Sequence, residues 1–282
     1  MQTKIRTLAE YLFFRGPYID QKQIDQHFKN KTILITGASF GIGESCAKRL
    51  AQTQCTLVLI ARSTDKLLEL KNELERGQCH VEMISVDLYE LDAAENIFQN
   101  LQMKNIQVDI VIHNAGKSIQ RSIWESLNRP QDIHRCIAIN YINPAQLTRL
   151  LLADLKLKCG QILVVSTINA KLFAPPFWSS YQASKTAMQQ WILSIQPELA
   201  VHQVNACLVY LPLVRTRMIL PTKQYDHMPA MHVQSAANAV LDSLIRRKRQ
   251  WQPWWLTLAQ LACGVLWRPI EYFNRSMLAR KK

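Results

Sequence analysis

The sequence lacks the features that mark several common classes of protein. Its seven cysteines form no C-x-x-C pair and have no histidine partners at metal-ligand spacing. An odd, dispersed set of this kind predicts reduced thiols in the cytoplasm and no metal site. Glu10 interrupts any apolar run after Lys4 and Arg6, so we find no secretory signal. There is also no internal repeat and no low-complexity segment.

What the chain does have is length, apolar content and positive charge. Its 282 residues suit one large α/β domain, alone or with appendages, and 48% apolar residues are ample for a core. The formal charge of +13 is high. It would favour binding to nucleic acid, to anionic lipid or to an anionic cofactor, and the alternative is a basic surface that binds no partner. No nucleic-acid motif appears, and the aromatic residues near the C-terminus sit in an apolar block, so we expect no nucleic-acid partner.

The most informative stretch runs from Lys31 to Gly43. A short apolar run, Ile33 to Ile35, has the length and β-branched content of a strand. Gly37, Gly41 and Gly43 follow, and then an apolar pattern of helical period. A strand, a glycine-rich turn and a helix form a unit that binds phosphate, because the turn approaches the anion and the helix N-terminus faces its charge. A flexible surface turn is the alternative.

The second apolar run, Thr56 to Ile60, ends at Ala61-Arg62-Ser63. In a dinucleotide-binding fold this strand end faces the adenosine ribose, where an acidic residue selects NAD. No acidic residue stands here, and the guanidinium of Arg62 suits a 2′-phosphate. The sequence therefore favours NADP(H), with an ordinary exposed arginine as the alternative.

Two more predicted strands end in residues that suit a cofactor site. Val81 to Val86 leads into Asp87-Leu88, where the carboxylate either accepts from the adenine amino group or caps a helix over Leu91 to Leu101. Val108 to Ile112 leads into Asn114-Ala115-Gly116, whose small residues let the backbone approach a cofactor. A plain turn is the alternative at the second position.

The residues that suit catalysis come later. A helical pattern from Arg129 to Leu155 contains Asn140, whose amide either holds a kink and an ordered water or bonds a neighbour. A strand from Gln161 to Val165 ends at Ser166-Thr167. Tyr181 and Lys185 share one face of a helix that ends near Ala200, and a nearby ammonium would lower the pKa of the phenol. Tyr181 would then act as an acid and base, although a lone Y-x-x-x-K is common by chance.

The last predicted strand is Val204 to Tyr210, and Ser235 to Arg249 is an amphipathic helix with a basic end. Five or six short strands that alternate with helices predict βαβ units and a parallel sheet covered on both faces. We divide the chain into a helical lead-in (1–30), this α/β domain (31–250) and an apolar, tryptophan-rich tail (251–282). Within the lead-in we expect a short amphipathic helix around Leu8 to Phe13, a break at Gly16-Pro17 and a polar stretch to Asn30.

Over roughly residues 30–250 the chain resembles the short-chain dehydrogenase/reductase family. The matching motifs are specific because they occur together, in order, at the expected strand and helix ends. The resemblance implies a Rossmann-like, doubly wound parallel sheet of about seven strands, and reversible hydride transfer between a nicotinamide and a carbonyl or alcohol. It makes Tyr181 the acid/base, Lys185 the group that lowers its pKa and holds the ribose, and Asn140 the anchor of a water. The implied cofactor contacts are Gly37, Ser39, Phe40, Gly41, Ile42, Gly43, Arg62, Asp87, Leu88, Asn114, Ala115, Gly116, Tyr181, Lys185, Pro212, Val214 and Thr216.

The chain departs from the family pattern at two positions. The family has a serine thirteen residues before the tyrosine, where this chain has Ile168. Thr167 takes the place of that serine if one residue is inserted before Tyr181, and Ser166 is the alternative. The other departure is Leu213, which follows Pro212 where the family commonly has glycine.

The tail and the loop before it bear on the substrate and on partners. Tryptophans among apolar residues, flanked by cations, suit a membrane interface, and Pro253 to Trp267 is shorter than the roughly 20 residues of a membrane span. A helix over the substrate site or at a subunit interface is the alternative. Met218 and Tyr225, in a loop over 217–233, are candidate substrate contacts together with Thr167.

We therefore expect an NADPH-dependent reductase of a lipophilic ketone or aldehyde. The alternatives are an NADP-dependent alcohol dehydrogenase and a cofactor-binding scaffold or regulator with little activity. We expect a homo-oligomer, a dimer or tetramer, in the cytoplasm, with the cytoplasmic face of a membrane as a second location.

Overall fold

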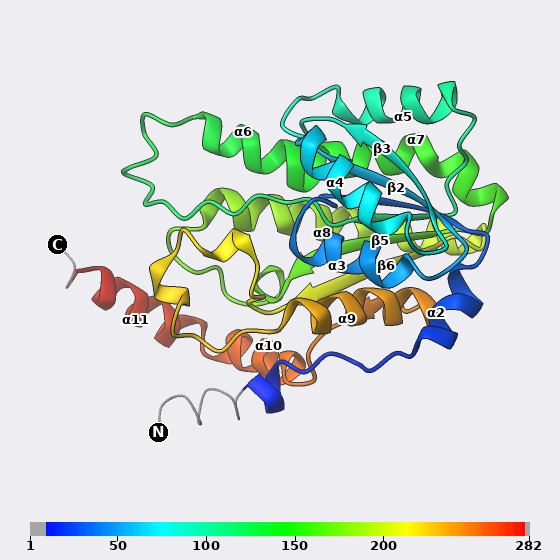
Figure 1. The fold of residues 1–282 in the computed structure, drawn as a ribbon. Coiled ribbons are helices and arrows are strands. Elements are labelled where there is room, and N and C mark those ends of the chain that lie inside the picture. The colour runs from blue at the N-terminus through cyan, green and yellow to red at the C-terminus, as the bar shows by residue number, and fades with distance from the viewer. Residues whose placement is uncertain (1–9, 280–282) are drawn as a thin grey trace.

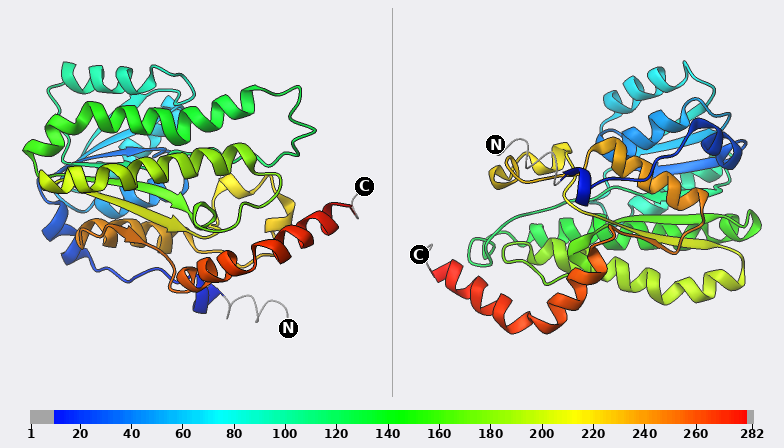
Figure 2. Two further views of the ribbon diagram at one scale, coloured as in Figure 1. Left: turned by 180° about the vertical axis from the view of Figure 1, so that it is seen from behind. Right: turned by 90° about the horizontal axis from the view of Figure 1, so that it is seen from below.

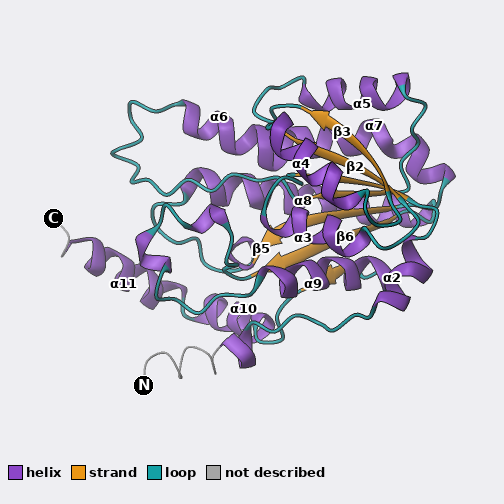
Figure 3. Ribbon diagram, in the orientation of Figure 1, coloured by secondary structure: helices purple, strands orange, loops and turns teal. Residues whose placement is uncertain are grey.

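The computed structural model describes residues 10–279, and its centre is one seven-stranded sheet (Figures 1 and 3). The strand order is β3-β2-β1-β4-β5-β6-β7, and every neighbouring pair is parallel. The order reverses between β1 and β4, which is where ligands bind in open α/β sheets. The strands are β1 (Thr32–Thr36), β2 (Thr56–Ala61), β3 (His80–Ser85), β4 (Ile110–His113), β5 (Gln161–Thr167), β6 (Asn205–Leu211) and β7 (Gln250–Trp251).

Helices cover both faces of the sheet because alternate strand residues point to opposite sides. Ile33 and Ile35 of β1 pack toward one helical layer, while Leu34 packs toward the other. The first layer holds α2 (Gln21–Phe28), α3 (Gly41–Leu50), α4 (Thr64–Leu74) and α9 (Val233–Ile245). The second holds α5 (Ala93–Met103), α7 (Asn143–Leu157) and α8 (Ser179–Val201). The predicted Rossmann-like doubly wound sheet is confirmed.

The N-terminal segment differs from the prediction. The stretch before Asn30 was expected to be a polar lead-in, but it contains α2. Asp20 and Gln23 form a reciprocal capping box at its start, and Ile24 and Phe28 are fully buried against the sheet. The helix predicted around Leu8 to Phe13 is present where the structure describes it, since residues 10–13 are helical and the Phe14 N–H donates to the Glu10 carbonyl at 3.0 Å.

The helix expected from Arg129 to Leu155 is present as α6 (Gln131–Ile137), a π-helical turn (Ala138–Ile142) and α7, which follow one another without a gap. One later prediction needs correction. The predicted helix over Ser235 to Arg249 ends at Ile245, and the chain then adds β7 beside β6. Trp251, which the predicted boundary assigns to the tail, therefore belongs to the sheet and packs against the core.

The start of the described chain meets the segment between β7 and α10 in a cluster that we call the clasp. Trp254 and Trp255 donate their indole N–H groups to the carbonyls of Leu12 and Phe13, at 3.2 and 2.9 Å. The rings of Phe13 and Trp254 stack with centroids 5.9 Å apart. In Figure 2 the start of the described chain accordingly lies beside α10. Glu10 continues the same segment and pairs with Arg215 in the loop after β6.

The tail forms two helices, α10 (Leu256–Val265) and α11 (Trp267–Ala279), where the sequence indicated one apolar segment. Leu256 is the only buried residue of α10, and none of the described residues of α11 is buried. Within residues 10–279, no helix combines the length and apolar character that crossing a membrane requires. The basic cluster at 280–282 lies outside the described residues.

Candidate active site

The glycine-rich turn between β1 and α3 has the geometry of a phosphate site. Gly37 and Gly41 have φ of 67° and 65°, a region that favours glycine. A Cβ on Gly43 would lie 2.5 Å from the carbonyl oxygen of Gly37, so only glycine allows this close packing. Within the described chain, Phe40 gives α3 no side-chain cap, which leaves backbone N–H groups at the helix start for an anion. Ser39 lies in the same turn, and Ile42 packs against the core.

The end of β4 holds this turn in place. Asn114 donates from its amide nitrogen to the carbonyls of Thr36 and Gly37, at 3.1 and 3.0 Å. The backbone N–H groups of Asn114 and Ala115 both donate to the Thr36 hydroxyl at 3.1 Å. The predicted Asn114-Ala115-Gly116 segment therefore lies against the glycine turn. Its residues fit a bound dinucleotide, because the cradle is built from backbone and would be filled by added side chains.

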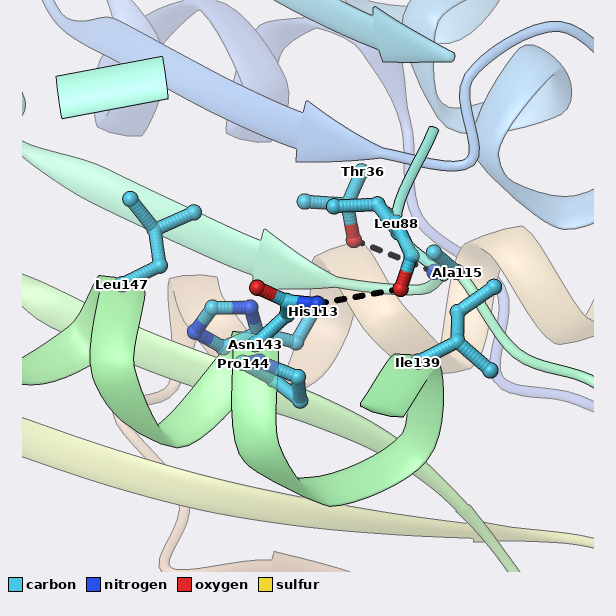
Figure 4. A pocket seen from close by; sticks show the side chains of 8 residues that line it. All are labelled: Thr36, Leu88, His113, Ala115, Ile139, Asn143, Pro144 and Leu147. Atoms are coloured by element: carbon cyan, nitrogen blue, oxygen red, sulfur yellow. Dashed lines mark hydrogen bonds between the residues drawn. The ribbon is translucent and has the colours of Figure 1, made fainter. Parts of the chain in front are cut away.

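A small pocket opens beside this segment, and its lining joins two predicted cofactor residues to α7 (Figure 4). Asn143 donates to the carbonyl of Leu88 at 3.0 Å, which fixes the turn after β3. Burial lowers the pKa of His113 to about 3, so the ring is neutral at pH 7. The eight lining residues are Thr36, Leu88, His113, Ala115, Ile139, Asn143, Pro144 and Leu147.

Arg62 and Asp87 come together at the ends of β2 and β3. The guanidinium of Arg62 lies 3.6 Å from the Asp87 carboxylate and 5.9 Å from the centre of the Tyr89 ring. Its side chain is 69% exposed and thus accessible to a ligand. Asp87 does not cap the following helix, because that helix begins after Asp92. The structure therefore brings these two predicted residues together at the adenosine end of the glycine turn.

The catalytic candidates meet where β5 and α8 approach each other. The Tyr181 phenol is hydrogen-bonded to the Thr167 hydroxyl. Lys185, one helical turn after Tyr181, is buried and donates from Nζ to the carbonyl of Val165 at 2.9 Å. A Cβ on Gly116 would lie 3.4 Å from that ammonium, so Lys185 also borders the cofactor segment. A proton donor, a hydroxyl and a cation are thus arranged beside the predicted nicotinamide end.

The pKa values at this site differ from the sequence-based prediction. Burial raises the pKa of Tyr181 to about 12, although the hydrogen bond to Thr167 acts in the opposite direction. Burial lowers the pKa of Lys185 to about 8. The expectation that the ammonium lowers the pKa of the phenol is wrong for the protein by itself, because Lys185 points its Nζ to Val165. Tyr181 is therefore held protonated at neutral pH, the form that donates a proton.

Asn140 has its amide fully engaged by neighbours. Its Nδ2 donates to the Lys117 carbonyl and to the Ser184 hydroxyl, each at 2.9 Å, and its Oδ1 accepts from the Lys117 N–H at 3.0 Å. The side chain bonds these neighbours from the π-helical turn, a feature common at functional sites. That Asn140 also anchors a water stays a prediction. Ser184 in turn donates to the carbonyl of Tyr181, so Asn140 ties the segment after β4 to the catalytic helix.

The loop after β6 closes over the glycine turn. A Cβ on Gly41 would lie 3.2 Å from the Thr216 methyl, and the Arg217 guanidinium lies 4.6 Å from the centre of the Phe40 ring. Thr216 and Phe40, both predicted cofactor residues, are therefore brought together. Pro212 and Val214 are buried, and Val214 forms a bridge with Met231. Leu213 fills the position of the family glycine, and its carbonyl accepts from the Met231 N–H at 2.8 Å.

Of the two candidate substrate contacts in this loop, the structure places one at the site. The Tyr225 ring stacks on Trp178, with centroids 6.2 Å apart, and Trp178 immediately precedes the helix of Tyr181. Met218 is 47% exposed, and among the described contacts none joins it to Tyr181. The sequence analysis missed Trp178 and Ser184, which lie three residues either side of Tyr181 and so share its helix face.

Comparison with known proteins now identifies the family. The model of the short-chain dehydrogenase family matches residues 31–226. This chain belongs to that family. A fatty acyl-CoA reductase of Acinetobacter baylyi is 34% identical over 226 residues, covering 80% of this chain and 76% of the relative. A fatty acyl-CoA reductase of Mycobacterium tuberculosis is 35% identical over 208 residues, covering 73% and 71%.

Solved structures agree with this short-chain dehydrogenase fold. An alcohol dehydrogenase of Thermococcus sibiricus, complexed with 5-hydroxy-NADP, has a TM-score of 0.65 at 25% identity, over 77% of this chain and 91% of that one. A short-chain dehydrogenase of Sphingobium yanoikuyae in complex with NADPH has a TM-score of 0.71 at 24% identity, over 88% and 95%. The protein is accordingly an NAD(P)-dependent oxidoreductase of the short-chain dehydrogenase family.

The contact between Tyr181 and Thr167 yields a first prediction about this short-chain dehydrogenase. Thr167→Ala removes the hydroxyl that meets the phenol and should lower kcat by a factor of about 10² to 10³, the effect of losing one positioned hydrogen-bond donor. Ser166→Ala should cost much less, because the buried Ser166 hydroxyl has no partner among the described residues. Steady-state kinetics of the two variants test the ranking. A larger loss in Ser166→Ala would give the carbonyl-polarising role to Ser166.

Proposed function

We propose that the protein is an NADPH-dependent reductase of a carbonyl on a long aliphatic chain. The observation that supports it most directly is the contact between the Tyr181 phenol and the Thr167 hydroxyl beside buried Lys185. Bound nicotinamide would supply hydride to the carbonyl carbon. Tyr181 would give its proton to the carbonyl oxygen, and Thr167 would hold that oxygen by a hydrogen bond. The reverse reaction would make the protein an alcohol dehydrogenase, and the cell's cofactor ratio would set the direction.

The carbonyl is proposed to be an aldehyde or ketone, and its lipophilic character is supported by the relatives named above. An acyl-CoA thioester is a second candidate, since two relatives carry the name fatty acyl-CoA reductase. NADPH consumption with matched aldehydes, ketones and acyl-CoA thioesters of increasing chain length tests both candidates. A rise of kcat/KM with chain length supports a lipophilic substrate. The absence of turnover with every carbonyl would favour the scaffold or regulator.

The cofactor preference gives a second prediction. Arg62→Ala should weaken NADPH binding by about 1.5 kcal/mol, roughly tenfold, and leave NADH binding nearly unchanged, because only NADPH carries the 2′-phosphate. We take the low end of the range for a charged hydrogen bond because Arg62 is largely exposed. Titration of each cofactor by fluorescence measures the effect. The matched control is Arg76→Ala, an exposed arginine after α4. Equal weakening of both cofactors would contradict a 2′-phosphate contact.

We also propose the two partners expected from the sequence. One is a second copy of the chain in a homo-oligomer, which analytical ultracentrifugation would detect. The other is an anionic membrane surface, to which α10 and α11 would bind through their exposed apolar residues. Support for the membrane comes from the amphipathic α11, where Trp267, Ile270, Phe273 and Met277 recur at helical spacing while Arg268 and Arg275 lie on the other side.

A further inference from the structure

Large exposed apolar side chains gather at one end of the molecule, on segments far apart in the sequence. We call the six on the two loops the apolar rim. Ile123, Trp124 and Leu127 lie in the loop between β4 and α6, and all are more than 60% exposed. The other three, in the loop after β6, are Met218, Leu220 and Met228.

The apolar rim lies at the catalytic end of the sheet. In Figures 1 and 2 both loops and α11 project from the same end in every view, the end toward which β5 and β6 point in Figure 3. The loops begin at β4 and β6, next to Gly116 and Thr216, and the second carries Tyr225 against Trp178. The exposed apolar surface therefore surrounds the place where a substrate reaches Tyr181.

A bilayer fits this surface better than a folded protein does. The rim consists of separate loop tips, and α11 packs chiefly against α10, so the segments present no single rigid, complementary face. Tryptophan beside flexible apolar residues and cations is typical of side chains that enter a lipid interface. The cations here are Arg129 after the first loop, Lys223 within the second, and Arg268 and Arg275 on α11. Anionic headgroups would attract these cations.

We infer that the protein docks on anionic phospholipid with the apolar rim inserted, so that its active site opens onto the bilayer. The substrate would then enter from the membrane without crossing water. This inference deepens the proposed membrane contact of the tail, and it adds the loops and the orientation. Its support, the exposed loop residues at the catalytic end, is independent of the tail.

The test is co-sedimentation with vesicles of phosphatidylcholine, with and without phosphatidylglycerol, at low and high salt. Wild type should bind the vesicles that contain phosphatidylglycerol, and salt should weaken the binding. Leu127→Glu should lower the partition coefficient by about tenfold or more, the loss of one buried leucine. The matched control is Leu157→Glu at the end of α7, just before β5 and thus at the opposite end of the strands. The Leu157 side chain is 70% exposed, against 71% for Leu127. This control should bind as wild type does.

The outcomes separate this inference from the proposals it builds on. Leu127→Glu should keep wild-type kcat with a short, water-soluble carbonyl and lose rate only with a long-chain one presented in vesicles. If Leu127→Glu binds vesicles normally while Trp267→Glu does not, the tail alone docks and the inference is overturned. If Leu127→Glu instead converts a lipid-free oligomer to a monomer, the rim is a subunit interface and the inference is likewise overturned.

Discussion

Tyr181→Phe is expected to lower kcat by a factor of about 10² or more and to leave NADPH binding nearly unchanged. The substitution keeps the ring that packs in the site and removes the proton donor, which is worth about 10² to 10⁴ in rate. Burial raises the pKa of Tyr181 to about 12, so the phenol is protonated across the neutral range and reduction should be insensitive to pH there. Oxidation of the alcohol needs the phenolate and should speed up as the pH rises. Steady-state rates in both directions and a cofactor titration measure these effects.

Tyr210→Phe is the matched control for that experiment. Tyr210 is fully buried in β6, and its hydroxyl has no hydrogen-bond partner among the described residues. Loss of that hydroxyl should change neither rate nor cofactor affinity. Comparable turnover in Tyr181→Phe and wild type would contradict the role of Tyr181 as proton donor, whatever the turnover of Tyr210→Phe.

Lys185→Met should lower the activity of the protein and raise its stability. Removing the ammonium that borders Gly116 should lower turnover by about 10², the lower end of the range for an acid–base group. The same change should raise the free energy of unfolding at pH 7. Burial lowers the pKa of Lys185 from 10.5 to about 8, which corresponds to a cost of about 3 kcal/mol for keeping the charge buried. Loss of the hydrogen bond to Val165 should reduce this increase in the free energy of unfolding by about 1 kcal/mol.

The pH dependence of unfolding supplies the check on Lys185. Below pH 8 the lysine is charged in both states, so the full cost of burial is present. Between pH 8 and 10.5 the folded protein releases the proton while the unfolded chain keeps it, so wild-type stability should rise through this window. Lys185→Met should lack that rise. Urea unfolding at several pH values measures both curves, and a variant less stable than wild type at pH 7 would argue against a strained buried charge.

Most of the sheet was predictable because strands such as β1, β2 and β5 contain short apolar runs bounded by polar or glycine residues, whereas the two-residue β7 was not predicted. Val58 and Ile60 show why, since they are buried on one face while Leu57 and Leu59 are buried on the other. The site candidates were predictable for a related reason. Parallel strands bring their carboxyl ends to one edge, so residues that follow β1, β4 and β5 must lie close together. The roles of these residues remain predictions.

What the sequence could not provide depends on packing. The π-helical turn around Asn140 holds an amide that bonds Lys117 and Ser184, neither of which is near it in the sequence. The direction of the Tyr181 pKa depends on how far the phenol is removed from water, which helical spacing does not reveal. The helix α2 was missed for a different reason: Asp20 and Gln23 are a readable capping box, but the stretch between the buried Ile24 and Phe28 is polar.

The clasp has a consequence for how the protein folds. Its hydrogen bonds join residues 242 positions apart, among the most non-local contacts the chain makes. Contacts of such sequence separation form late, because a long stretch of chain must first be ordered between them. During synthesis the segment near Phe13 emerges long before its partners Trp254 and Trp255. Because Glu10 lies in the segment that the clasp holds and pairs with Arg215 in the loop after β6, we expect that loop to reach its final position only after the sheet has formed.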